Sequence, residues 1–111
     1  MNIGVFTGSR ANYSSTKTIL LALKDEVDVN LVNIVGGGAT LSRYGSIPEL
    51  MVRDGVGKPD FTFNMFIDGE FHSDMAKSCG LGIVEMSTIL RNCSLDALVV
   101  VGDRYDVMSA V

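Results

Sequence analysis

The sequence has few of the residues from which metal and disulfide sites are built. It contains two cysteines, Cys79 and Cys93, without a Cys-x-x-Cys pair, and a single histidine, His72. A structural zinc site draws on closely spaced pairs of such ligands, and a disulfide framework needs more cysteines than this chain has. We therefore expect neither kind of site, and we interpret both cysteines as buried thiols on one helix.

The chain also lacks an excess of positive charge and a long apolar run. Nine lysines and arginines stand against thirteen aspartates and glutamates, which gives a formal net charge of −4. A nucleic-acid-binding domain normally carries a basic patch, and a membrane span needs roughly 18 consecutive apolar residues, so neither partner is expected. No charged and apolar leader opens the sequence, which favours a soluble cytoplasmic protein.

Two phosphate-binding patterns are absent as well. The chain has neither the Gly-x-x-x-x-Gly-Lys-Ser/Thr pattern of a P-loop nor the Gly-x-Gly-x-x-Gly dinucleotide fingerprint. Its triple glycine, Gly36-Gly37-Gly38, fits neither pattern. We interpret it as a flexible loop at the rim of a cleft, although the close approach of a sugar would also favour missing side chains there.

The chain contains the same strand-and-turn pattern twice. Residues 2–6 and 97–101 are short apolar runs of the kind buried on both faces of a parallel sheet, and each run is followed at once by a polar turn that contains glycine. Parallel neighbouring strands end at the same edge of a sheet, where α/β proteins bind ligands. Arg10 and Arg104, one from each turn, could then face one anionic ligand.

The remaining segments complete an α/β pattern. Residues 27–35 and 61–66 predict two more strands, and the 111-residue chain has material for one core, so we expect a four-stranded parallel sheet in the order 3-2-1-4. Ser14 or Ser15 is expected to cap a first helix, and Ser46 to open a short one through a capping box with Glu49.

A long third helix is expected to begin after Ser73 and to present one apolar stripe to the sheet. Gly80 and Gly82 within it suggest close packing, and His72 is placed in a surface loop before it. The stripe consists of Met75, Cys79, Gly82, Ile83, Met86, Ile89, Leu90 and Cys93.

Several of these segments together carry a family resemblance. In order and spacing they resemble the start of the UDP-N-acetylglucosamine 2-epimerases, in particular the hydrolysing branch that feeds sialic-acid and related nonulosonic-acid synthesis. Asn12 stands where that family usually has an aspartate. The segments are Thr7-Gly8-Ser9-Arg10-Ala11-Asn12-Tyr13, Tyr44-Gly45, Asp54-Gly55, Lys77-Ser78-Cys79-Gly80 and Gly102-Asp103-Arg104-Tyr105-Asp106.

The resemblance implies a Rossmann-like, three-layer fold in which residues 1–111 form the incomplete first part of the N-terminal half of a two-domain, GT-B-like enzyme. The second domain, which would close the active site, is absent from this chain, so the chain alone is expected to be inactive. The implied reaction converts UDP-N-acetylglucosamine to N-acetylmannosamine and UDP by elimination and then hydration, without a cofactor or an essential metal. Arg10, Ser14 and Arg104 match UDP-binding positions, and Asp103 matches a position implicated in catalysis. A homo-oligomer is also implied.

Three other functions remain open at this stage. The substrate of the same reaction could be UDP-N,N′-diacetylbacillosamine, or the architecture could serve a GT-B-type glycosyltransferase. A non-catalytic α/β binding module is the third alternative. Its receiver-like form needs an acidic cluster after the first strand, and Thr7-Gly8-Ser9-Arg10 is polar and cationic instead.

Overall fold

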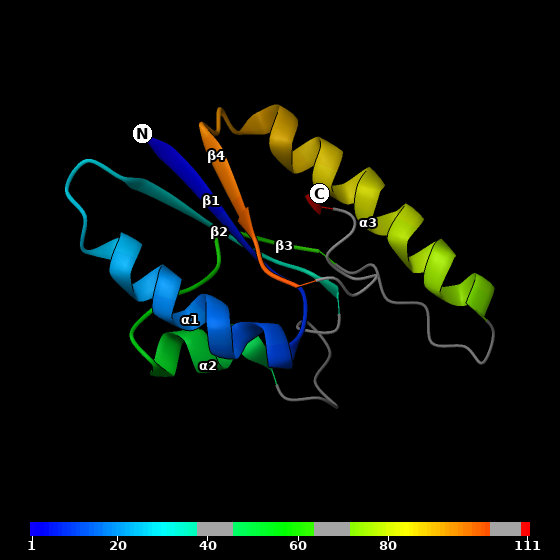
Figure 1. Cartoon of the computed structure of the whole chain (residues 1–111), viewed down its shortest axis with the longest axis horizontal. Helices are drawn as coiled ribbons and strands as arrows, with labels where there is room; N and C mark the ends of the chain where they lie inside the picture. The colour runs from blue at the N-terminus through cyan, green and yellow to red at the C-terminus, as the bar shows by residue number, and fades with distance from the viewer. Residues whose placement is uncertain (38–45, 64–71, 103–109) are drawn as a thin grey trace.

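A four-stranded parallel sheet forms the centre of the protein. The computed structural model describes residues 1–37, 46–63, 72–102 and 110–111. The strands run in the order β3-β2-β1-β4, as the sequence predicted (Figure 1). The strands are β1 (Asn2–Thr7), β2 (Asn30–Val35), β3 (Phe61–Thr62) and β4 (Ala97–Val100), and the helices are α1 (Arg10–Lys24), α2 (Ile47–Arg53) and α3 (His72–Asn92).

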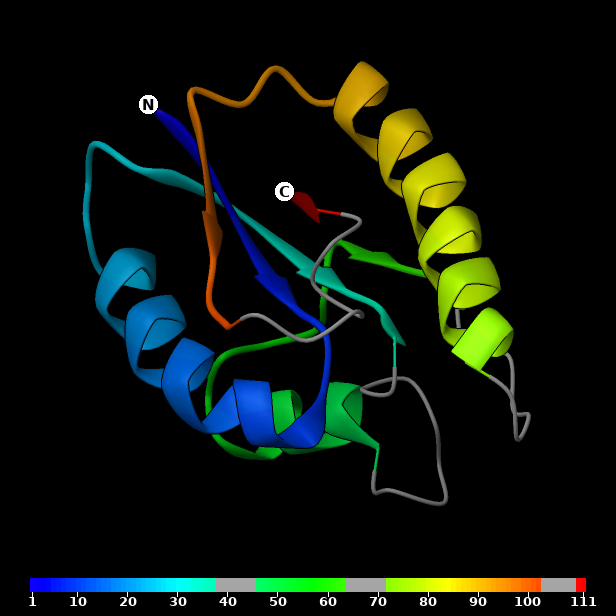
Figure 2. The same ribbon diagram turned by 45° about the vertical axis from the view of Figure 1, so that its right-hand side comes forward.

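Helices cover both faces of this sheet, which confirms the predicted three-layer arrangement (Figure 2). Successive residues of a strand point to opposite faces, so Val5 and Phe6 of β1 enter different cores. Val5 packs with α1 and α2, in a core that includes Leu20 and Met51. Phe6 packs on the α3 side, where its ring stacks on that of Phe63 with centroids 6.0 Å apart.

Helix α1 begins at Arg10, earlier than predicted. The residue before it, Ser9, has an extended backbone, and its side chain accepts a hydrogen bond from the backbone N–H of Asn12. That bond satisfies one of the free donors of the first turn, so Ser9 caps the helix. The prediction that Ser14 or Ser15 is the cap was wrong, because Ser9 already ends the turn that follows β1.

Three other details of the predicted elements differ: the start of β2, the capping of α2 and the length of the third strand. Strand β2 begins at Asn30 and not at Val27, whose side chain is 97% exposed in the turn after α1. Ser46 is the N-cap of α2, but its side chain makes no capping hydrogen bond, so the predicted capping box is not formed. Of the predicted third strand, only Phe61–Thr62 is seen as a strand, and residues 64–66 lie outside the described part.

Helix α3 is less buried than its sequence pattern suggested. Met86 and Ile89 of the predicted stripe are buried, but Met75 and Ile83 are 47% and 54% exposed. The half of α3 that begins at His72 extends past the sheet (Figure 1), so its apolar side chains have less to pack against. Gly82 is buried, as close packing requires, whereas a methyl group added at Gly80 would meet no atom within 4 Å.

Candidate functional site

The carboxyl ends of β1, β2 and β4 lie at one edge of the sheet. Thr7 is paired with Val35, and Phe6 is paired with both Ile34 and Val100. The backbone N–H of Gly36 donates to the Thr7 carbonyl at 3.0 Å, which extends the β1–β2 ladder by one step. The first polar turn and the end of β4 are therefore neighbours, as the sequence predicted.

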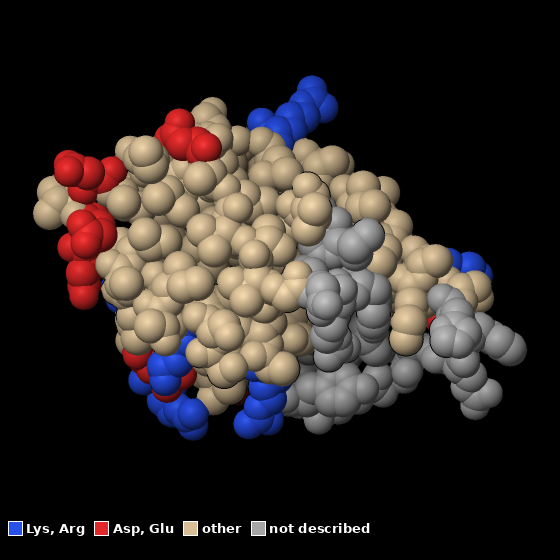
Figure 3. All heavy atoms as spheres, viewed as in Figure 1, with Lys and Arg blue, Asp and Glu red and all other residues tan. Residues whose placement is uncertain are grey.

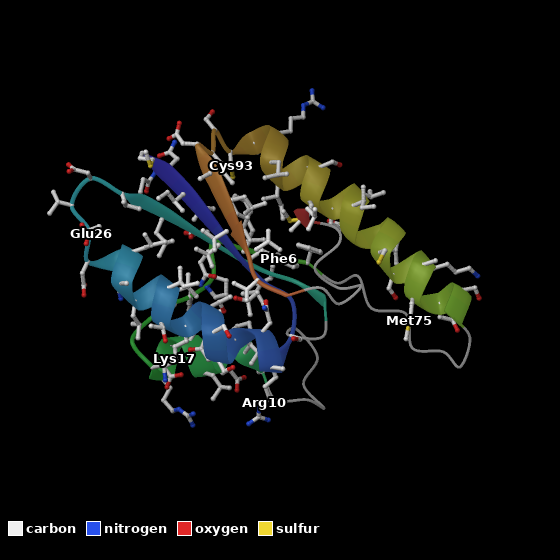
Figure 4. All side chains as sticks on the ribbon, viewed as in Figure 1. Phe6, Arg10, Lys17, Glu26, Met75 and Cys93 are labelled. Carbon is white, nitrogen blue, oxygen red and sulfur yellow. The ribbon has the colours of Figure 1, made fainter. Side chains whose placement is uncertain are left out.

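The turn between β1 and α1 presents Arg10 at the start of a 15-residue helix. Arg10 is exposed and its side chain points away from this end of α1 (Figure 4). Ser14 lies one turn further along the same helix face and is also exposed, with its hydroxyl donating to the Ala11 carbonyl at 2.8 Å. An anion here would meet the positive end of the α1 helix dipole and a guanidinium together.

Charge is distributed unevenly along α1. Acidic side chains gather at the far end, in the turn that leads to β2, where Asp25, Glu26 and Asp28 are exposed (Figure 3). Glu26 and Arg10 lie at opposite ends of the helix (Figure 4). These three acidic side chains therefore lie at the opposite end of α1 from the candidate anion site.

A buried hydroxyl pair fixes α1 on the end of β1. The Oγ1 atoms of Thr7 and Thr16 are 2.8 Å apart, and both residues are fully buried. A buried polar pair of this kind favours one geometry, because separating the two hydroxyls would cost their buried hydrogen bond. Nothing in the sequence pattern marks these two threonines, since Thr16 looks like an ordinary helix residue.

Asn12 makes three hydrogen bonds at this edge and was not identified as important from the sequence. Its backbone N–H is held by Ser9, its Oδ1 accepts from the Gly8 N–H at 3.0 Å, and its Nδ2 donates to the Val101 carbonyl at 2.6 Å. The side chain therefore joins the β1–α1 turn to the end of β4. The sequence signal for this bridge is an asparagine four residues after the glycine of the β1–α1 turn.

The glycines after β2 differ from the flexible loop that was predicted. Gly36 is buried, and a Cβ atom there would lie 2.5 Å from Cζ of Phe63. Gly37 is also buried and has a φ of 61°, in the region that favours glycine. Packing and backbone conformation explain these two glycines, and Gly38 lies outside the described residues.

Two predicted site residues, Asp103 and Arg104, lie outside the described residues. His72 is the first residue of α3 and not part of a loop, and its side chain is outside the described part. Among the residues that the structure describes, no three His, Cys, Asp or Glu side chains are grouped to hold a metal ion. No helix in the described part of the chain is both long and apolar enough to cross a membrane.

The first turn of α1 is tied to the end of α2 by a charged cluster. Burial first, and then the hydrogen bond to Asp54, raise the pKa of Tyr13 to about 12. The same hydrogen bond, with Lys17 and Arg53 nearby, lowers the pKa of Asp54. Lys17 Nζ is 3.5 Å from Asp54 Oδ2, so this carboxylate is paired with a cation as well as with the phenol.

The chain is similar to known proteins in sequence and in fold. No family model matches the chain. A curated relative, polysialic acid biosynthesis protein P7 of Escherichia coli, is 26% identical over 109 residues, which are 93% of this chain and 26% of that protein. The chain thus spans about a quarter of the length of this relative.

Solved structures with the same fold are UDP-N-acetylglucosamine 2-epimerases. One aligns with a TM-score of 0.81 at 16% identity, over 98% of this chain and 28% of its own. The enzyme from Neisseria meningitidis, bound to UDP-N-acetylglucosamine, aligns with a TM-score of 0.79 at 14% identity, over 99% of this chain and 28% of its own. The chain has the parallel, Rossmann-like α/β fold that is found in these 2-epimerase structures.

Proposed function

We propose that this chain is part of a hydrolysing UDP-N-acetylglucosamine 2-epimerase and contributes to its UDP site. The observation that carries the proposal is that the polar turn leading to Arg10, the first residue of α1, follows β1 at the same sheet edge at which β4 ends. Similar folds occur in 2-epimerases, one of which is bound to UDP-N-acetylglucosamine. The relationship to a polysialic acid biosynthesis protein supports the branch that supplies N-acetylmannosamine.

The chemistry assigns different tasks to the site residues. The C2 proton is removed while the C1–O bond to UDP breaks, which leaves a 2-acetamidoglucal; water then adds across the double bond to give N-acetylmannosamine. The leaving diphosphate needs cations and N–H donors, which Arg10, Ser14, Arg104 and the start of α1 would supply. Asp103 is the proposed catalytic carboxylate. No cofactor or metal takes part in the scheme.

The proposal includes a second domain that closes the cleft over the sugar, so residues 1–111 alone would not turn over substrate. It also includes a homo-oligomer in the cytoplasm. Five of the large hydrophobic side chains exposed in the described part lie on α3, and they offer a surface for self-association. They are Met75, Leu81, Ile83, Val84 and Leu90.

The test is UDP release by the complete protein that carries this chain, with the sugar product identified. Release of UDP and N-acetylmannosamine from UDP-N-acetylglucosamine alone is the expected result. Release only from UDP-N,N′-diacetylbacillosamine would change the substrate, and release only with an added sugar acceptor would indicate a glycosyltransferase. UDP binding without release from either substrate would leave the binding-module alternative and would contradict the enzymatic proposal.

A further inference from the structure

The side chain of Asn12 continues the sheet ladder beyond the last paired strand residues. Strands β1 and β4 are paired up to Phe6 and Val100, and β1 itself ends one residue later, at Thr7. The next donor on one side is the Gly8 N–H, and the next acceptor on the other is the Val101 carbonyl. Asn12 Oδ1 accepts from the first at 3.0 Å and its Nδ2 donates to the second at 2.6 Å.

This carboxamide takes the place of a peptide group between the two segments. Gly8 is buried, so its N–H would be costly to leave without a partner. Gly102, directly after Val101, has a φ of 104°, and a Cβ atom there would lie 3.8 Å from Asn12 Nδ2. The backbone of β4 thus turns immediately beside the Asn12 side chain, and the position of that turn depends on it.

Only a group with one acceptor and one donor can make both bonds. A backbone N–H must face the oxygen of Asn12, and a carbonyl must face its nitrogen, so the orientation of the amide is fixed by its partners. An ionised carboxylate can accept from Gly8, but it has no proton for the Val101 carbonyl. An aspartate in this position would need to be protonated to form the same bridge.

We infer that Asn12 is a positioning residue that sets the separation of the β1–α1 turn and the turn after β4. The inference rests on the proposed function in one respect: the spacing matters for UDP because both turns are proposed to hold it. Asn12 itself makes no contact with the reacting atoms in this scheme. It acts through Gly8 and Val101.

The variants Asn12→Asp and Asn12→Ala test the inference in the complete protein, with Asn30→Asp as the matched control. Asn30 is an exposed residue at the start of β2, so the control makes the same chemical change at the opposite end of the sheet. The dissociation constant of UDP is measured from pH 5 to pH 8 and divided by the wild-type value at each pH. This ratio cancels the titration of UDP and of the groups that wild type and variant share.

At pH 8, N12D should bind UDP about tenfold more weakly than the wild type, the loss expected for one hydrogen bond. Its ratio should return toward one as the pH falls, because the protonated carboxyl can donate to Val101. N12A should stay weak at every pH, and Asn30→Asp should remain near one. A ratio near one for N12D and N12A at every pH, or the same pH-independent loss in both, would overturn the inference.

A second measurement keeps the inference separate from the proposed function. Amide hydrogen exchange at Gly8 should be at least about tenfold faster in N12A, whereas the amide of Val5 should be unchanged. If the wild type binds no UDP, the proposed function fails, and this exchange experiment still decides whether Asn12 forms the bridge. Unchanged exchange at Gly8 would contradict the inference whatever the UDP result.

Discussion

The phenol of Tyr13 donates a hydrogen bond of 2.9 Å to Asp54 Oδ2, which joins the first turn of α1 to the end of α2. Tyr13 is buried, and Lys17 and Arg53 lie within 4 Å of the same carboxylate. The neutral phenol is therefore favoured in the folded protein, while the carboxylate is favoured in its charged form.

This link predicts a specific loss of stability at high pH. The pKa of Tyr13 is raised from 10.0 to about 12, so the folded protein holds this proton more tightly than the unfolded chain does. The contribution of this proton to the free energy of unfolding is complete below about pH 10 and is lost as the pH rises to about 12. In urea unfolding, Tyr13→Phe should cost about 1 to 2 kcal/mol at pH 7, and this difference should shrink between pH 10 and 12.

Asp54 provides the corresponding test of stability at acidic pH. Its lowered pKa means that its contribution is present at neutral pH and is lost as the pH falls through the folded-state value. Asp54→Asn should remove that part of the acid dependence. A constant difference between wild type and Tyr13→Phe across the alkaline range would show that the Tyr13 proton is not linked to folding.

Arg10→Ala and Arg104→Ala should each weaken UDP binding by about 1.5 to 3 kcal/mol, because each arginine is proposed to donate a charged hydrogen bond to the diphosphate. Isothermal titration calorimetry of the complete protein measures this. Arg91→Ala, an exposed position in the last turn of α3, is the control and should leave the affinity unchanged. Wild-type affinity in both test variants would remove these arginines from the proposed site.

Asp103→Asn should keep most of the UDP affinity and lower turnover strongly, since the amide preserves size but loses basicity and charge. Steady-state rates of UDP release and a UDP titration on the same preparation separate the two effects. If the variant turns over at the wild-type rate, Asp103 serves the conformation of the turn and not the chemistry.

Two glycine substitutions should have opposite effects on stability. Gly36→Ala places a methyl group against the buried ring of Phe63 and should destabilise the fold by about 1 to 3 kcal/mol. Gly80→Ala adds a methyl group in open space on a helix and should stabilise the protein by about 0.5 to 1 kcal/mol. Urea unfolding of both variants checks this, and equal effects would contradict the packing described at Gly36.

Self-association should depend on the exposed face of α3. Val84 is 62% exposed there, so Val84→Glu should lower the sedimentation coefficient at a given concentration. Val27→Glu is the matched control, because Val27 is exposed in the turn after α1, away from that face. If Val27→Glu dissociates the protein and Val84→Glu does not, the association surface lies elsewhere.

The sequence alone determined the architecture of the sheet and the edge at which its first polar turn lies. Two apolar runs, each followed by a polar turn with glycine, predicted parallel strands, and the order 3-2-1-4 was confirmed. Runs of this kind are informative because a strand buried on both faces must be apolar along its whole length. The edge at which Arg10 lies followed from that topology.

Only the tertiary structure decided which side chains join the segments. Ser9 and not Ser14 caps α1, because capping depends on where the turn after β1 ends. The bridge from Asn12 to Val101 spans 89 positions in the sequence, and no local pattern reports a contact of that range. The exposure of Ile83 on α3 could not be read from a local pattern either. A helix buries its apolar stripe only where a sheet lies beneath it.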